Sequence, residues 1–185
     1  MPEEVYEPRE DSFLAAKVLE EEDLEGKKVL DLGTGTGILA IIASRNGGKV
    51  LAADKNPEAV KYAKSNAERN GIELKVKKSN LFGSLDDKFD LIVFNAPYLP
   101  GDGRYDKMED LSWKGGEKGN ELILNTIEKA KEYLNEKGRL LLVQSSRTGR
   151  KETMEKLEEE GFETRIVREK KVPWENLLVI EAILV

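Results

Sequence analysis

Four residues at the end of an apolar run could hold a planar amino group. Asn95, Ala96, Pro97 and Tyr98 directly follow residues 89–94, which have the composition of a buried strand. The side-chain oxygen of Asn95 and the backbone carbonyl of Ala96 can accept hydrogen bonds from both N–H bonds of an –NH2 group, which orients its nitrogen and relieves developing positive charge. Pro97 biases Ala96 towards an extended backbone, and Tyr98 can stack on the planar group. The pattern favours chemistry on an amide or amine nitrogen, although a strand-ending turn uses the same residue types.

A glycine-rich loop after an earlier apolar run predicts a nucleoside site. Gly33, Gly35 and Gly37 follow that run, and glycines let the backbone approach a ligand closely. The helix expected next offers unpaired N–H groups to a carboxylate or phosphate. Asp54 follows about twenty residues later, at the end of the next strand, where it can accept both hydroxyls of a ribose. The spacing differs from the dinucleotide fingerprint, and the Lys-Ser or Lys-Thr pair of a phosphate loop is missing. Asp31 has two expected roles, as a ligand of a cofactor amino group and as an acceptor that closes the loop.

Composition limits the class of protein. With 185 residues, 39% of them hydrophobic, residues 1–185 are expected to form one domain with a sizeable core. The absence of cysteine and histidine excludes disulfides, thiolate metal sites and Ser-His triads, so no metal site is expected. No apolar run has the length of a membrane span, and the acidic start is unlike a signal peptide, so we expect a cytoplasmic protein. Abundant Glu and Lys are typical of a heat-adapted protein.

Alternating strands and helices are expected to position these residues. The strand pattern covers residues 28–32, 49–53, 73–78, 89–94, 138–144, 162–167 and 174–185, and the helical pattern covers 8–22, 38–45, 57–70, 121–135 and 151–160. This order predicts an α/β fold with a doubly wound, mostly parallel seven-stranded sheet and helices on both faces. The last two strands lack a helix between them, so we place them as an antiparallel C-terminal hairpin at one edge. The N-terminal helical segment, residues 1–26, is expected to pack on this domain.

The chain resembles the class I, Rossmann-like S-adenosylmethionine-dependent methyltransferases, and among them the HemK-type protein-glutamine N5-methyltransferases. Residues 95–98 match the Asn-Pro-Pro-Tyr motif of that family, and residues 31–37 match its cofactor loop. Residues 6–14 are similar to the N-terminal segment of the short archaeal and eukaryotic branch, and residues 113–119 resemble the loop after its catalytic strand. The resemblance therefore covers nearly the whole chain.

The resemblance implies S-adenosyl-L-methionine as the cofactor and assigns residues to it. The predicted cofactor-binding residues are Ser12, Asp31, Gly33, Thr34, Gly35, Gly37, Asp54, Lys55, Asn80, Leu81 and Asn95. Asn95 would also orient the acceptor amide, together with Ala96, Pro97 and Tyr98. Ala96 replaces the usual proline but keeps the carbonyl. Asn80 replaces the usual aspartate, and its oxygen can still accept a hydrogen bond from the adenine amine, so we expect weaker cofactor binding.

The resemblance also implies a substrate and a partner. The implied acceptor is the glutamine of the Gly-Gly-Gln loop in a translation termination factor. Members of the short branch typically work with a small zinc-binding activator subunit that covers a hydrophobic edge of the methyltransferase. Two other functions stay open: methylation of the exocyclic amine of adenine in DNA or RNA, and an inert scaffold that only binds cofactor. A net charge of −6 argues against nucleic acid, and the intact Asn95 and Tyr98 argue against a scaffold.

Overall fold

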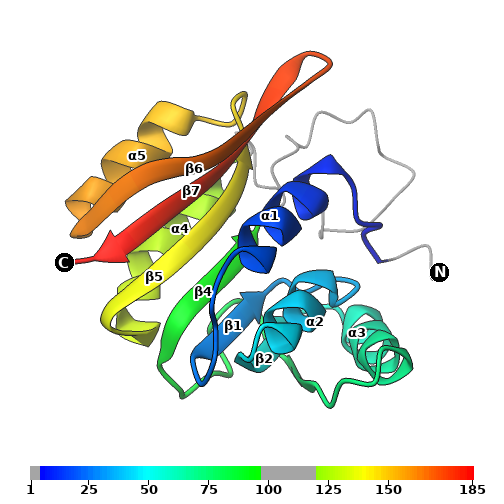
Figure 1. The fold of residues 1–185 in the computed structure, drawn as a ribbon. Helices are drawn as coiled ribbons and strands as arrows, with labels where there is room; N and C mark the ends of the chain where they lie inside the picture. The colour runs from blue at the N-terminus through cyan, green and yellow to red at the C-terminus, as the bar shows by residue number, and fades with distance from the viewer. Residues whose placement is uncertain (1–4, 97–119) are drawn as a thin grey trace.

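A mixed seven-stranded β-sheet lies at the centre of the structure, a computed structural model that describes residues 5–96 and 120–185 (Figure 1). The strands span Lys28–Leu32 (β1), Lys49–Asp54 (β2), Lys75–Lys78 (β3), Phe89–Asn95 (β4), Leu134–Ser145 (β5), Phe162–Val172 (β6) and Glu175–Leu184 (β7). Their order in the sheet is β3-β2-β1-β4-β5-β7-β6. The strand β7 runs antiparallel to β5 and to β6, and the other neighbouring pairs are parallel.

Helices cover both faces of this sheet (Figure 1). They span Glu10–Glu20 (α1), Ile38–Arg45 (α2), Pro57–Arg69 (α3), Glu121–Ala130 (α4) and Arg150–Glu159 (α5), with a 3-10 turn at Lys131–Tyr133. Successive side chains of a strand point to opposite faces. Leu30 and Ile92 therefore enter the core that includes residues of α4 and α5, whereas Val29 and Leu91 enter the core against α1 and α2. Among the described residues, no helix has the length and apolar content that a membrane span requires.

The strand order reverses between β1 and β4, which fixes where a ligand can bind. From β1 the chain proceeds outwards to β2 and β3, then returns to place β4 on the other side of β1. Leu32 and Phe94 are paired partners at the carboxyl ends of these two parallel strands. The glycine loop after β1 and the segment after β4 therefore leave the sheet side by side. In a doubly wound sheet this reversal is the usual place for a ligand.

The predicted fold class is confirmed, and so is the antiparallel C-terminal hairpin at one edge of the sheet. Within this hairpin β7 pairs with β5, and β6 lies at the edge. The strand β6 also continues to Val172, beyond the predicted end at residue 167. Its charged continuation, residues 168–171, hides the strand pattern, but the backbone pairing with β7 does not depend on these side chains.

The helix predicted at 121–135 ends earlier than expected. It stops at Ala130, and β5 begins at Leu134, four residues before the predicted strand. Leu134 pairs with Phe89, and both side chains are buried in the core on the α4 face. Burial of Leu134 through sheet pairing therefore overrides the local helical periodicity.

A buried ion-pair network joins α1 to the C-terminal strands. Glu181 of β7 is 2% exposed and accepts hydrogen bonds from Arg139 of β5, at 2.7 Å, and from Arg165 of β6. Arg139 also contacts Glu22, just after α1, at 2.6 Å. Burial alone would raise the pKa of Glu181, but the hydrogen bonds from the two arginines outweigh burial and lower it. The two arginines therefore stabilise the ionised form of Glu181.

We expect Glu181→Ala to destabilise the protein by about 3 kcal/mol, because it leaves the Arg139 guanidinium partly buried with one partner fewer. Urea denaturation of the variant measures this loss. Glu155→Ala is the matched control, since Glu155 makes an exposed i,i+4 pair with Lys151, and such pairs contribute at most about 0.5 kcal/mol. Equal stability changes for the two variants would contradict a stabilising role of the network.

Candidate active site

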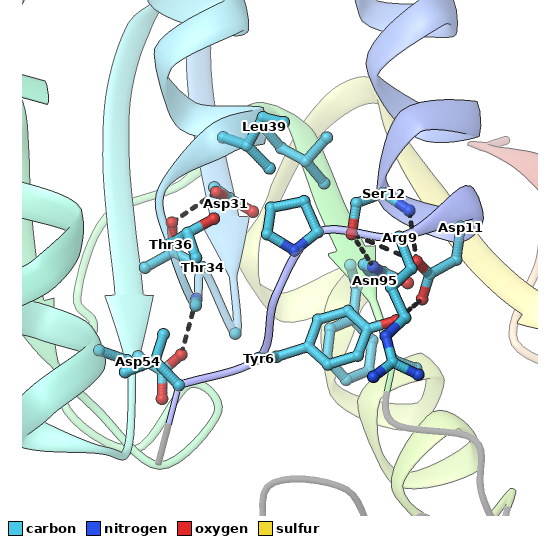
Figure 2. A pocket seen from close by; sticks show the side chains of 18 of the residues that line it. Tyr6, Arg9, Asp11, Ser12, Asp31, Thr34, Thr36, Leu39, Asp54 and Asn95 are labelled. Atoms are coloured by element: carbon cyan, nitrogen blue, oxygen red, sulfur yellow. Dashed lines mark hydrogen bonds between the residues drawn. The ribbon is translucent and has the colours of Figure 1, made fainter. Parts of the chain in front are cut away.

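A cavity of about 500 Å³ opens at the carboxyl ends of β1, β2 and β4 (Figure 2). Its walls come from the start of α1, the loop after β1, the end of β2, the turn after β3 and the end of β4. Eleven of the predicted site residues line it: Ser12, Asp31, Gly33, Thr34, Gly35, Asp54, Lys55, Asn80, Leu81, Asn95 and Ala96. Pro97 and Tyr98 lie outside the described residues. The fold therefore brings residues from five segments of the chain to one cavity.

The glycine loop has the open backbone that the sequence predicts. Gly33 and Gly35 have φ values of +68° and +54°, the left-handed region that glycine adopts without strain. The N–H of Gly33 donates to Ala53 of β2 at 2.8 Å. The N–H of Gly35 donates to Oδ2 of Asp54 at 2.9 Å. The loop is thus tied to the end of β2, and Asp54 is held at the edge of the cavity.

Gly37 is the one predicted residue in the described chain that does not line the cavity. It precedes α2 with φ +82°, and a Cβ at this position would lie 3.1 Å from the Cα of Ala63 in α3. A glycine here lets the start of α2 approach α3 closely. The structure gives Gly37 a packing role, and its predicted contact with the cofactor stays a prediction.

Asp31 lies at the end of β1 and is almost fully buried, with 2% of its surface exposed. Its Oδ2 accepts hydrogen bonds from Oγ1 of Thr34 at 2.6 Å and from the N–H of Ala40 in α2 at 3.0 Å. Burial raises the pKa of Asp31 to about 7, against the lowering effect of these two hydrogen bonds, and the nearby Asp54 adds to the rise. Both hydrogen bonds close the loop against α2, one of the two roles that the sequence suggests.

The raised pKa of Asp31 predicts a pH dependence of stability. Between the ordinary aspartate pKa of 3.8 and about 7, the folded protein holds a proton on Asp31 that the unfolded chain has released. The stabilisation from this proton is complete below the unfolded pKa and is lost as the pH rises through about 7. Asp31→Asn removes this titration. We therefore expect the melting temperature of the variant, relative to the unsubstituted protein, to be higher at about pH 8 than at about pH 5. A difference in melting temperature between the variant and the unsubstituted protein that does not change with pH would contradict the prediction.

A chain of hydrogen bonds sets the orientation of Asn95 (Figure 2). The Nδ2 of Asn95 donates to Oγ of Ser12 at 3.1 Å, and Oγ of Ser12 in turn lies 3.3 Å from Oδ1 of Asp11. The same Oδ1 accepts from the backbone N–H of Ser12 at 2.6 Å, while Oδ2 accepts from the hydroxyl of Tyr6 at 2.7 Å. Because Asp11 can only accept when ionised, Ser12 must donate to it and accept from Asn95.

This arrangement leaves the carboxamide oxygen of Asn95 for a ligand. Oδ1 of Asn95 is buried and has no hydrogen-bond partner among the described residues. A buried acceptor without a partner is costly in a folded protein, and this residue lines the cavity. The site therefore offers one oriented acceptor to an N–H group, beside the backbone of Ala96.

Residues outside the predicted set also reach the cavity. Tyr6 and Asp11 line it, where the hydroxyl of Tyr6 donates to Asp11 and Asp11 accepts from Ser12; their signal in the sequence is the resemblance of residues 6–14 to the N-terminal segment of the family. Val172 and Glu175 line the cavity from the β6–β7 hairpin. These two residues, which are close to the C-terminus in sequence, reach the site because β7 pairs antiparallel with β5. Among the described residues, no cluster of three or more metal-ligating side chains is present.

The cavity is suited to a nucleoside that carries an amino-acid part. Asp54 lies where ribose hydroxyls could donate to it, and Asp31 lies where a cationic amine could. The side chains of Leu39 and Phe94 form apolar parts of the cavity wall. The buried Oδ1 of Asn95, which has no partner among the described residues, lies apart from these carboxylates (Figure 2) and could accept a hydrogen bond from the N–H group of a second ligand. The geometry thus accommodates a cofactor and an amino or amide acceptor side by side.

Comparisons with known proteins agree with this description. The family model of the methyltransferase small domain matches residues 11–172. An inferred protein N5-glutamine methyltransferase of Methanocaldococcus jannaschii is 42% identical over 182 residues, which are 97% of this chain and 91% of that protein. The solved Mtq2–Trm112 complex of E. cuniculi, described as responsible for methylation of the translation termination factor eRF1, superposes with a TM-score of 0.80 at 30% identity and covers 98% of this chain and 99% of that one. A release factor glutamine methyltransferase of Streptococcus pneumoniae is 31% identical over 76% of this chain, which spans about half of that longer protein (54%).

Proposed function

Because the chain belongs to the family of methyltransferase small domains, we propose that it methylates the side-chain amide of glutamine in the Gly-Gly-Gln loop of a translation termination factor. It is an S-adenosylmethionine-dependent N-methyltransferase. The observation that carries the proposal is the buried, unpartnered Oδ1 of Asn95 at the cavity, which fits an amide N–H. The similarity to glutamine methyltransferases over nearly the whole chain supports this acceptor class. We further propose that residues 1–185 act as one domain in the cytoplasm.

The cofactor-binding roles follow from the donors and acceptors around the cavity. S-adenosylmethionine, when bound, supplies an electrophilic methyl group on a positively charged sulfur. We assign Asp54 to the ribose hydroxyls and Asp31 to the amino group of the methionine part. Gly33 and Gly35 leave room for the ligand because they have no Cβ. Asn80 and Leu81, in the turn after β3, lie on the cavity wall where an adenine ring could be held.

The acceptor amide is held by the segment after β4. Oδ1 of Asn95 accepts a hydrogen bond from the N–H of the acceptor, and the backbone carbonyl of Ala96 is assigned to the second N–H. These bonds would stabilise the positive charge that develops on the amide nitrogen as it takes the methyl group. The cofactor sulfur would keep the electron pair of the broken S–C bond and leave as the neutral thioether S-adenosylhomocysteine, and the proton lost from the nitrogen would pass to solvent. Asp11 and Ser12 act as positioning residues, because they hold the carboxamide of Asn95 with its oxygen towards the acceptor.

A small activator subunit is part of the proposal. The E. cuniculi relative is described as a complex with Trm112. In this chain β3 pairs only with β2 among the described strands, so its other edge is open. Val76 and Ile72 beside it are only partly buried. We propose that a small zinc-binding protein pairs with this edge and covers these apolar side chains.

A methyl-transfer assay with radiolabelled S-adenosylmethionine tests the function. The purified chain, alone and with the zinc-binding activator, is incubated with termination factor, with its Gln-to-Ala variant in the Gly-Gly-Gln loop, or with adenine-containing nucleic acid. We expect label on the factor and none on the variant. Label on nucleic acid would establish an adenine methyltransferase instead. No label on any acceptor, with the activator present, would favour the inert scaffold that only binds cofactor.

A further inference from the structure

The turn between β6 and β7 carries a tryptophan where the backbone favours glycine. Val172 and Glu175 are paired partners, so Pro173 and Trp174 form a two-residue turn. The φ of Trp174 is +76°. With proline at the first central position, this conformation matches a type II turn, whose second central position prefers glycine or asparagine. A bulky residue with positive φ is strained.

Packing against the described part of the chain does not offset this strain. The side chain of Trp174 is 92% exposed, the largest exposed fraction among the large hydrophobic residues of the described chain. It therefore gains almost no burial from its position. An exposed aromatic residue in an unfavourable backbone conformation is better explained by a contact with another molecule than by the stability of this one.

The tryptophan is flanked in the chain by residues of the active-site cavity. Its neighbours Val172 and Glu175 line the cavity, as does Leu177. Oγ of Ser145 donates a hydrogen bond to Glu175, and Lys170 lies 3.6 Å from Glu10 at the start of α1. Figure 1 shows the hairpin reaching past the carboxyl end of β4. The strand β7 thus contacts β5 near the tip, and β6 contacts the start of α1. The tip itself points outwards.

We propose that the tip of this hairpin, residues 172–175, is a docking element for the acceptor protein, with Trp174 as its aromatic anchor. This inference rests on the proposed function, in which the acceptor is a protein. A glutamine that reaches Asn95 carries the surface around it against the cavity rim, where the tip lies. Exposed tryptophans are frequent hot spots of protein interfaces, and the net charge of −6 disfavours nucleic acid as the occupant.

The test uses Trp174→Gly, because glycine suits the turn and should not unfold the protein. Methylation kinetics are measured, with the activator present, on the whole termination factor and on a short peptide that contains the Gly-Gly-Gln loop. For the whole factor we expect kcat/KM to fall about 30-fold, the effect of a typical hot spot. For the peptide we expect kcat/KM to be unchanged, since the peptide lacks the surrounding surface of the factor that would contact Trp174. Cofactor affinity should be unchanged and the melting temperature equal or higher.

Val185→Ala is the control, since Val185 is also exposed (84%) but lies at the far end of β7. This substitution should leave kcat/KM unchanged for both the whole factor and the peptide. An unchanged kcat/KM of Trp174→Gly on the whole factor would overturn the inference. An equal loss on factor and peptide would also overturn it, because the residue would then act on the cavity itself. If the unsubstituted protein methylates nucleic acid and not the factor, the proposed function fails, whatever the variant does.

Discussion

Replacing Asn95 by alanine is expected to lower kcat for methyl transfer by at least about 100-fold, the usual effect of removing one oriented hydrogen-bonding group from a transition state. The reason is the buried Oδ1 of Asn95, the acceptor that the cavity offers to the amide N–H. Cofactor affinity should change only a few-fold, because Asp31 and Asp54 remain. Single-turnover kinetics give the rate, and calorimetric titration gives the affinity.

Two further variants separate this role from a structural one. Ser12→Ala removes the acceptor of the Nδ2 hydrogen bond and frees the carboxamide to rotate, so we expect a smaller loss, of about 10-fold. Asn135→Ala is a matched control, since Asn135 bonds Asp90 at the opposite end of the sheet, and its activity should be normal. A loss of cofactor affinity in Asn95→Ala as large as the loss of rate would contradict the assignment to the acceptor.

Replacing Asp54 by alanine is expected to weaken cofactor binding at least about 100-fold, because a carboxylate that accepts two ribose hydroxyls contributes two charge-assisted hydrogen bonds. The substitution also releases the N–H groups of Gly35 and Asn56, which Asp54 holds at 2.9 Å each. The rate at saturating cofactor should fall much less. Calorimetric titration with S-adenosylhomocysteine measures the affinity.

Asp86→Ala is the control for Asp54→Ala. Asp86 is an aspartate whose side chain is 96% exposed, and it does not line the cavity. Its replacement should leave cofactor affinity unchanged. If Asp54→Ala bound the cofactor normally, the ribose assignment would be wrong. A fall in its melting temperature without a fall in affinity would assign Asp54 to the loop structure alone.

The ends of β1 and the start of α2 could be predicted because local signals mark them. Val29, Leu30 and Leu32 give residues 28–32 the composition of a strand, and the glycines that follow cannot continue a strand without cost. Both β1 and α2 begin and end at the predicted residues. Asp54 and Asn95 could be predicted for the same reason, since each ends a buried strand and lies on the ligand side of a parallel sheet.

Other parts of the site depend on long-range packing, which local patterns do not show. Glu175 reaches the cavity only because β7 is inserted between β5 and β6. The hydrogen bonds that link Asp11 and Ser12 to Asn95 join residues that are more than eighty positions apart. The role of Gly37 could not be predicted either, because the close approach of Ala63 is a property of two packed helices.

Tandem mass spectrometry of the methylated termination factor tests the central claim most directly. The factor is incubated with the chain, the activator and S-adenosylmethionine, and the peptides that span the Gly-Gly-Gln loop are fragmented. We predict one added methyl group on the side-chain nitrogen of that glutamine, and none when Asn95→Ala replaces the unsubstituted chain. A methyl group on another residue, or the same glutamine methylation by Asn95→Ala, would contradict the account.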